Sequence, residues 1–199
     1  HMALAVIAAV LPTIPSMAQI PEGYYNSLKG KKGAELKTAV YNVIKNAKVL
    51  SYGSGSGHTW WGFWLTDRDS RGYKDLYNLM PCESKINSTK SNYPMGTVVS
   101  GDKGNGWTKV GNGSDGNTYW EPADPWKGDF ARGYMYMATT YQNFTWKGAA
   151  ALQILQQGTY PTLQKWAYTL FIKWAKADRP DALEIQRNED VYKIQGNRN

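Results

Sequence analysis

The chain has 199 residues, a length that suits one domain with a sizeable core and argues against two. Aromatic residues make up 14% of the sequence, far more than a disordered chain carries, so an unfolded protein is excluded. Lys and Arg number 23 against 16 Asp and Glu, which gives a net charge of +7. This excess favours a polyanionic partner such as nucleic acid, and plain solubility is the alternative explanation.

Residues 1–18 are predicted to be a signal peptide for export. An apolar run at 3–11 is followed by Ser16 and Ala18, whose small side chains suit cleavage after Ala18 and leave 19–199 as the mature domain. No Lys or Arg precedes the run, which departs from the usual signal. The run is short and two prolines follow it, so a stable membrane anchor is not expected. The alternative, a buried N-terminal helix, suits those prolines poorly.

Cys82 is the only cysteine, so no disulfide can form within the chain. No His lies near it in sequence, and we expect a small packed side chain there instead of a nucleophile. The fold must therefore depend on its apolar core.

The first half of the chain mixes a helix with short strands. Residues 33–46 have helical apolar spacing, and 49–52 and 59–66 are β-prone. A Gly/Ser segment at 53–57 predicts a flexible link between those two strands. Residues 97–122 alternate glycines with short β-prone runs, which predicts hairpins within the same domain.

The last third is predicted to be helical. The first helix, at 124–141, has an Asp-Pro start and the apolar stripe Phe130, Tyr134, Met137 and Tyr141. Three further helices are predicted at 148–157, 162–177 and 181–194, the second with the stripe Leu163, Trp166, Ala167, Leu170 and Trp174. The predicted class is a single α+β domain, mainly helical with a small β portion.

A polar segment within residues 73–96 is the main candidate site. An apolar run ends at Pro81, and Glu83, Lys85 and Asn87 follow closely. Carboxylate, ammonium and amide groups at this density suit a phosphate with a bound divalent cation. They also suit an ordinary solvated loop, which is the favoured interpretation of the segment taken alone.

Three segments together resemble the bacterial endonuclease I family, secreted or periplasmic nucleases with a ββα-metal (His-metal finger) active site. They are Asp-Leu-Tyr-Asn-Leu-Met-Pro and its continuation at 75–94, Gly-Asp-Phe-Ala-Arg-Gly-Tyr at 128–134, and Arg-Asn-Glu through Gln-Gly-Asn-Arg-Asn at 187–199. All three occur in the family's order, so the resemblance covers most of the mature chain.

The resemblance implies metal-assisted hydrolysis of phosphodiester bonds. In relatives a His acts as general base, and one divalent cation is held by a Glu beside that His and by an Asn of the motif helix. Hard oxygen ligands suit Mg²⁺. Asn87 matches the metal-binding Asn, and its alternative role is a helix N-cap.

Four basic residues are candidates for nucleic-acid binding. Lys90 stands where relatives often carry Arg and is expected to contact phosphate as a point charge. Lys85, Arg187 and Arg198 are expected to extend a basic face. Each of the four has a solvated-surface role as its alternative. Arg132 is expected to be structural, paired with an acidic neighbour.

The sequence departs from the family at the catalytic pair. It contains no Glu-His dipeptide, and the block at 59–69 runs directly into Tyr73, where relatives place several tens of residues. This loss would remove one strand of the finger and leave it incomplete. His58 does not match the base by motif and would need a rearrangement to replace it. The carboxylates of Asp67, Asp69, Asp75 and Glu83 are possible replacement metal ligands.

These features predict an exported, Mg²⁺-dependent endonuclease acting on DNA, with RNA as a further substrate, and without strong sequence preference. Loss of the Glu-His pair predicts much reduced hydrolysis, as in a defective copy. The alternatives are a non-catalytic nucleic-acid-binding protein and, from the Trp-rich block, a carbohydrate-binding module. A monomer is expected.

Overall fold

The computed structural model describes residues 31, 34, 35, 38, 56–58, 72, 75–81 and 84–199. The predicted signal peptide, the strands expected at 49–52 and 59–66, and Cys82 lie outside these residues. Positions 34, 35 and 38 are helical, as predicted for 33–46. The Thr38 hydroxyl donates to the carbonyl of Ala34 at 2.9 Å, one helical turn away.

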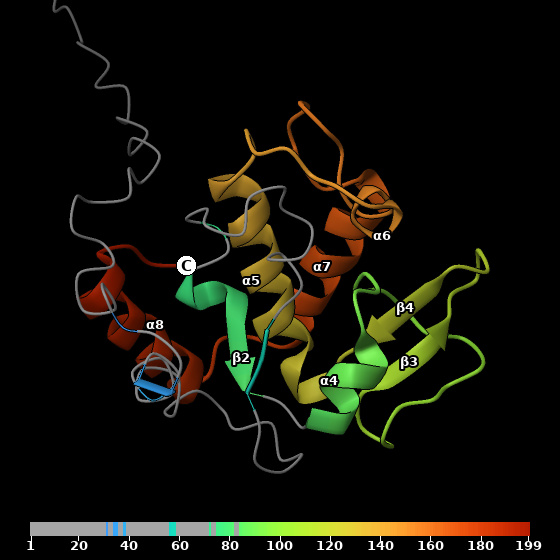
Figure 1. Cartoon of the computed structure of the whole chain (residues 1–199), viewed down its shortest axis with the longest axis horizontal. Helices are drawn as coiled ribbons and strands as arrows, with labels where there is room; N and C mark the ends of the chain where they lie inside the picture. Colours follow the sequence, from blue (N-terminus) through green and yellow to red (C-terminus); the bar gives the residue numbers. More distant parts are fainter. Residues whose placement is uncertain are drawn as a thin grey trace, which may run out of the picture.

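Two long helices form the centre of the fold. Helix α5 (Lys127–Thr140) follows a 3₁₀ turn η2 (Asp124–Trp126), and it packs along α7 (Lys165–Ala177) (Figure 1). Pro125 supplies the fixed φ that favours a helix start. The apolar stripe predicted for the first of these helices is buried at every position, so that prediction is confirmed: Phe130, Tyr134, Met137 and Tyr141.

The stripe predicted for α7 is only partly correct. Trp166 is 38% exposed, whereas Phe171 is fully buried. The Phe171 ring meets Tyr134 of α5 edge-on at 5.6 Å between centroids. The face of α7 that contacts α5 is therefore rotated from the predicted one, because the partner helix selects the buried face.

The helix predicted at 148–157 is much shorter than expected. Helix α6 covers only Ala149–Leu152, and α7 starts at Lys165 instead of 162. The intervening backbone pairs with itself: Gln156 N–H donates to the Thr162 carbonyl at 2.7 Å, and Gln164 N–H donates to Ile154 at 2.8 Å. These bonds replace the helical ones, so the helix cannot continue.

The predicted hairpin is present. Strands β3 (Lys109–Asn112) and β4 (Thr118–Glu121) pair antiparallel, with Val110 opposite Trp120. The segment that precedes β3 lies along its other edge, where the Asn112 N–H donates to Ser100 at 2.8 Å. Figure 1 shows this hairpin at one end of the molecule, beside α4 (Ser84–Lys90).

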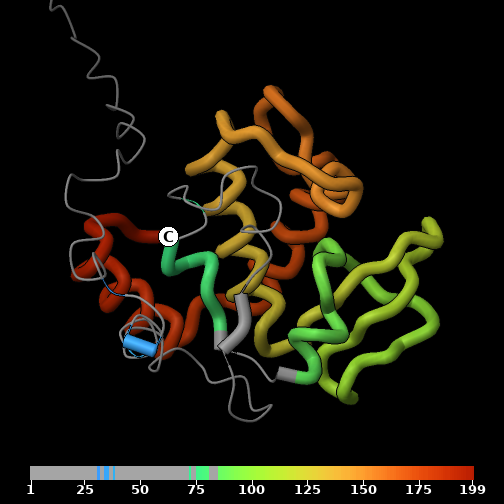
Figure 2. The backbone as a smooth tube through the Cα atoms, in the orientation of Figure 1, coloured from blue at the N-terminus to red at the C-terminus, as the bar shows by residue number. Residues whose placement is uncertain are grey.

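The last helix, α8 (Ala182–Gln195), lies at the other side of α5. Its N-cap is Asp181, whose carboxylate accepts from the N–H groups of Leu183 and Glu184, and it ends at Gly196 in the left-handed conformation. The chain end then lies beside the 3₁₀ turn η1 (Leu76–Asn78) (Figure 2). The Gln195 side chain accepts the Leu76 N–H at 2.6 Å, which fixes this contact.

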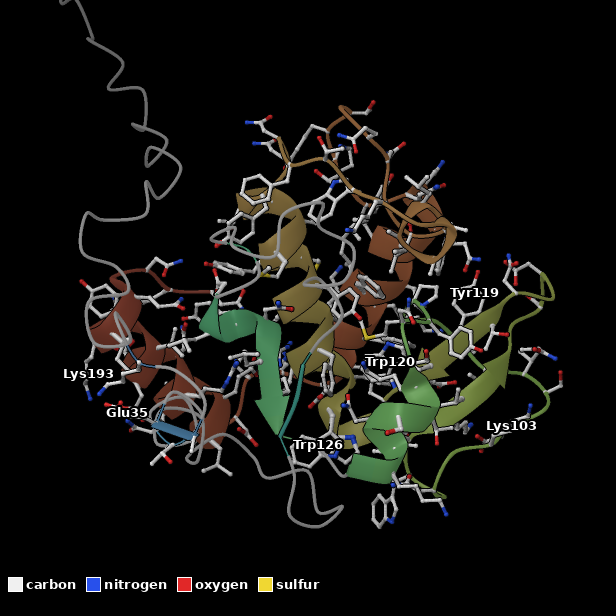
Figure 3. The ribbon with its side chains drawn as sticks, viewed as in Figure 1. Glu35, Lys103, Tyr119, Trp120, Trp126 and Lys193 are labelled. Carbon is white, nitrogen blue, oxygen red and sulfur yellow. The ribbon has the colours of Figure 1, made fainter. Side chains whose placement is uncertain are left out.

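The core is aromatic and continuous between the hairpin and the helices (Figure 3). Trp120 of β4 meets Phe130 of α5 edge-on at 4.9 Å. The largest fully buried side chains are Trp120, Tyr134, Phe171, Leu76, Met95, Met137, Ile154 and Leu155. This is the predicted single α+β domain. No helix among the described residues is long and apolar enough to cross a membrane.

Candidate metal and nucleic-acid site

A ββα finger is present in the described part of the chain. Strand β1 (Ser56–His58) pairs antiparallel with β2 (Leu79–Pro81), and α4 follows. The expectation that the finger lacks a strand is wrong, because the Gly/Ser segment supplies one. Ser56 and Gly57 belong to β1 and not to a link. In a flexible link the backbone N–H and C=O groups of this segment would bond to water. Pairing with β2 gives them partners within the protein instead.

His58 is the last residue of β1. Its backbone stands opposite Leu79 in the strand register. Helix α4 packs against the same strand. The only other histidine in the sequence is His1, so His58 is the single histidine within the finger.

Asn87 lies inside α4, three residues after its first residue. The alternative role as N-cap is therefore wrong. Its side-chain oxygen Oδ1 is buried and accepts no hydrogen bond from any described residue. A buried carbonyl oxygen without a donor is costly, and a hard cation would satisfy it. Within the described residues, no cluster of three His, Cys, Asp or Glu side chains could hold a metal by itself.

The two lysines of α4 have different environments. Lys85 is exposed to solvent. Lys90 is buried, and its Nζ lies 5.0 Å from the centroid of the Trp120 ring, a cation–π contact. The solvated-surface alternative is therefore wrong for Lys90. Ile86 joins the same core cluster as Trp120 and fixes α4 on the hairpin.

Arg187 lies inside the protein and not on a basic surface. Its Nη2 donates to the carbonyls of Leu76 and Leu79, at 3.0 and 2.9 Å, and its guanidinium lies 5.5 Å from the Tyr77 ring centroid. Burial lowers the pKa of Arg187 from its ordinary value. This side chain connects α8 to η1 and β2, the segment that leads into α4.

Arg198 is exposed, and its guanidinium contacts two side chains of α8. Its Nε and Nη2 donate to the two carboxylate oxygens of Glu189 at 2.8 and 2.9 Å. Its guanidinium also lies 3.5 Å from the Tyr192 ring centroid. The hydrogen bonds with Glu189 raise the pKa of Arg198 and lower that of Glu189. Such an exposed pair contributes little to stability.

Asp75 is a structural anchor and not a replacement metal ligand. It is fully buried; Oδ2 accepts from the hydroxyls of Tyr136 and Tyr141 at 2.8 and 2.6 Å. Oδ1 accepts from the Tyr77 N–H and the Gln195 amide at 2.8 and 3.2 Å. Both oxygens are thus satisfied by donors. An Asp directly before an apolar run is an N-cap signal that could have identified this role. Asp67, Asp69 and Glu83 lie outside the described residues.

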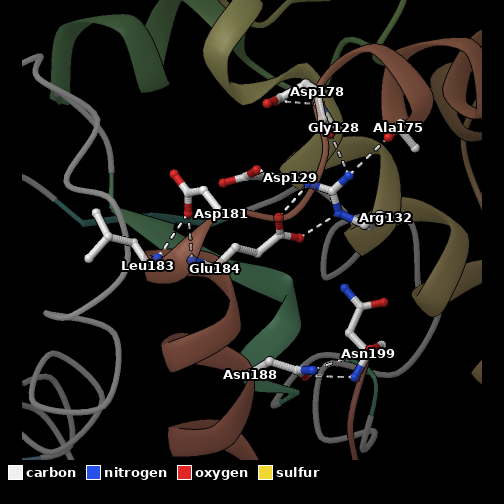
Figure 4. Close-up of polar contacts among 10 residues, drawn as sticks. All are labelled: Gly128, Asp129, Arg132, Ala175, Asp178, Asp181, Leu183, Glu184, Asn188 and Asn199. Atoms are coloured by element: carbon white, nitrogen blue, oxygen red, sulfur yellow. Dashed lines mark hydrogen bonds and ion pairs between the residues drawn. The ribbon is translucent and has the colours of Figure 1, made fainter.

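Arg132 has the structural role expected for it (Figure 4). Its guanidinium pairs with Glu184 of α8 and with Asp129 of α5, and Nη1 donates to the Asp178 carbonyl at 2.7 Å. Asp178 Oδ2 in turn accepts the Gly128 N–H at 2.9 Å. A side chain on Gly128 would meet the Asp178 carbonyl at 1.9 Å, so glycine is required there. This cluster joins the N-terminal end of α5 to α8.

Two curated proteins are similar to most of the chain. The extracellular ribonuclease of Bacillus amyloliquefaciens is 29% identical over 222 residues, covering 89% of this chain and 74% of the relative. The extracellular ribonuclease of Bacillus subtilis (strain 168) is 27% identical over 228 residues, covering 88% and 73%. The first alignment spans 222 positions, which is several tens more than the number of residues in 89% of this 199-residue chain. That relative therefore has residues without a counterpart here.

The family comparison covers nearly all of the finger and every helix from α4 to α8. The sequence profile described as Endonuclease I matches residues 57–199, well over half of the chain. The match contains most of β1, Asn87, Arg187 of α8, and the chain end with Arg198. The chain therefore belongs to the Endonuclease I family of nucleases.

Proposed function

We propose that this protein is an exported, metal-dependent endonuclease that hydrolyses phosphodiester bonds of RNA and DNA without strong sequence preference. Family membership supports the nuclease activity, and the names of the two ribonuclease relatives support RNA as a substrate. Their description as extracellular, together with the signal predicted at 1–18, supports export. A monomer remains our expectation.

The observation that carries the proposal is the buried Oδ1 of Asn87. It lies on the helix of a ββα finger and has no donor among the described residues. Asn87 would hold one Mg²⁺ through this oxygen, with water and a substrate phosphate completing the hard-oxygen shell. When bound, the cation supplies charge stabilisation at the phosphate and the leaving oxygen. Helix α4 keeps Asn87 in place because Ile86 is anchored in the core.

The remaining residues would position the substrate and accept a proton. Lys85, exposed two residues before Asn87, would contact phosphate as a point charge. His58 is the candidate general base, because it is the one histidine of the finger and its strand pairs with β2. The family's Glu-His pair is absent from this sequence, so we expect hydrolysis to be slow.

A second candidate function is nucleic-acid binding without hydrolysis. The observation that favours it is the absence of any Glu-His dipeptide, which removes both a metal ligand and a base from the family's set. In that case the cation site at Asn87 would still bind, and phosphate contacts would give salt-dependent retention of nucleic acid.

Nicking assays separate the two functions. Purified protein is incubated with supercoiled plasmid and, in parallel, with single-stranded RNA, in Mg²⁺ and in EDTA. We expect slow cleavage in Mg²⁺ that EDTA stops, that Asn87→Ala abolishes, and that Ser88→Ala, on the same helix, leaves intact. His58→Ala should also reduce cleavage; unchanged cleavage would remove His58 from the site. Retention of substrate without any cleavage at high protein concentration would establish the binding function instead.

A further inference from the structure

Trp107, one of several exposed aromatic residues outside the candidate site, lies in the turn that precedes β3. Trp107 is 58% exposed, although most aromatic side chains of the described region are buried. No described residue stacks on its ring or places a cation over it. A large apolar ring left in water is free to gain energy by contact with a partner.

The turn that presents Trp107 is tightly held. The Asn105 side-chain oxygen accepts from the N–H groups of Trp107 and Thr108 at 3.2 and 3.0 Å. Gly106 has φ +84°, a conformation that other residues rarely adopt. A Cβ on Gly104 would meet the Thr108 carbonyl at 1.8 Å, so the turn also needs glycine there. A partner would therefore meet Trp107 without first having to order the loop.

Two lysines flank this turn. Lys103 N–H donates to the Val110 carbonyl at 2.7 Å, which places Lys103 beside β3, and Lys109 is the first residue of that strand. Both side chains are exposed, and Lys103 lies at the outer edge of the hairpin (Figure 3). Neither lysine forms an ion pair with a described residue. The acidic Asp102 is engaged through Oδ1, which accepts from Gly104 and Val110.

The turn belongs to the same rigid unit as the candidate metal ligand. Val110 of β3 and Trp120 of β4 share a core cluster with Ile86, the neighbour of Asn87. Lys90 of α4 also lies over the Trp120 ring. The hairpin that carries Trp107 is thus the surface on which α4 rests.

We propose that Trp107, Lys103 and Lys109 form a platform for single-stranded nucleic acid, on which an unpaired base stacks on the indole and the flanking phosphates contact the lysines. The proposal rests on the proposed function for the class of ligand. Aromatic stacking with cationic neighbours is how proteins hold single strands, since every base has a π face. In a duplex the bases are stacked on one another and do not reach an exposed indole. The platform therefore gives a preference for unpaired segments.

Binding in EDTA tests this platform without any hydrolysis. Fluorescence anisotropy is measured with an end-labelled RNA strand, the DNA strand of the same sequence and the duplex. We expect Trp107→Ala to weaken single-strand binding about tenfold, as loss of one stacked base implies, and to leave duplex binding unchanged. Trp107→Phe should restore most of the affinity. Val99→Ala, another exposed apolar residue that precedes the turn, is the matched control and should have no effect.

The lysines have a separate readout. Lys103→Ala and Lys109→Ala should each lower the slope of log K against log salt by about 0.7, the value for one phosphate contact on a single strand. Equal affinity of Trp107→Ala and the unaltered protein for both single strands would overturn the proposal, and so would an equal loss on single strands and duplex. If Trp107→Ala loses affinity for the RNA strand alone, or for the DNA strand alone, the platform is specific for that kind of nucleic acid. Failure of the nuclease function would appear instead as intact binding without cleavage in Mg²⁺.

Discussion

The guanidinium of Arg187 supports the main chain of Leu79: Nη2 donates to the Leu79 carbonyl at 2.9 Å and to the Leu76 carbonyl at 3.0 Å. One side chain of α8 thus fixes the 3₁₀ turn and strand that lead into α4. The Leu79 carbonyl belongs to the strand that pairs with β1. The geometry of the finger therefore depends on a residue more than a hundred positions away in the sequence.

Arg187→Ala should lower the free energy of unfolding by about 3 kcal/mol, because it removes two hydrogen bonds that a buried charged group donates, although the Leu76 carbonyl still accepts the Leu79 N–H. Urea denaturation followed by circular dichroism measures this. Arg198→Ala is the matched control, since it removes an exposed ion pair with Glu189 and an exposed contact with the Tyr192 ring, and it should change stability by about 0.5 kcal/mol or less. Equal midpoints for the two variants would contradict the structural role of Arg187.

Tyr141→Phe should destabilise the protein by about 2 kcal/mol, because its hydroxyl donates to the buried carboxylate of Asp75 at 2.6 Å and bonds to a charged group are the stronger ones. Tyr160→Phe is the control, since Tyr160 is 70% exposed. Thermal unfolding of both variants gives the comparison. A Tyr141→Phe variant as stable as Tyr160→Phe would show that Asp75 is satisfied by its other donors.

Patterns local in sequence predicted the long elements well. Helices α5 and α8 begin and end close to the expected residues, because Pro125, Asp181 and Gly196 act on the backbone next to them. The pairing of 154–156 with 162–164 was missed, since it joins two segments whose own spacing favours helix. Strand β1 was missed for a related reason: its partner β2 lies over twenty residues away, and nothing in a Gly/Ser run indicates that pairing.

At the candidate site, the sequence identified the candidate residues but could not show which charged side chains are buried and which are exposed. Lys90 and Arg187 were predicted to be surface cations, and both are buried. Lys90 lies over the ring of Trp120, and Arg187 donates to two backbone carbonyls. Only the packing of distant segments shows this. Lys85, with the same local signal, is exposed.

Lys85→Ala should weaken nucleic-acid binding to a similar extent for every sequence tested and lower the salt slope by about 0.7 to 0.9, as expected for one phosphate contact. Stability should be unchanged, because the side chain is exposed. Lys173→Ala removes the same charge from an exposed position on α7 and is the control. Titrations in EDTA at several salt concentrations provide the slope. An identical slope for the two variants would place Lys85 outside the interface.

Mg²⁺ should stabilise the folded protein through Asn87, whether or not the chain cleaves nucleic acid. A ligand that binds only the folded state adds RT ln(1 + [L]/Kd), about 1.4 kcal/mol at tenfold the Kd, which raises the Tm of a chain of this size by roughly 3 °C. Asn87→Ala should show no such rise, because the buried Oδ1 is gone. Asn87→Asp keeps an oxygen at that position and should retain the rise. Differential scanning calorimetry with Mg²⁺ and with EDTA measures all three proteins. The assignment of the cation to Asn87 fails if the alanine variant gains as much as the unaltered chain.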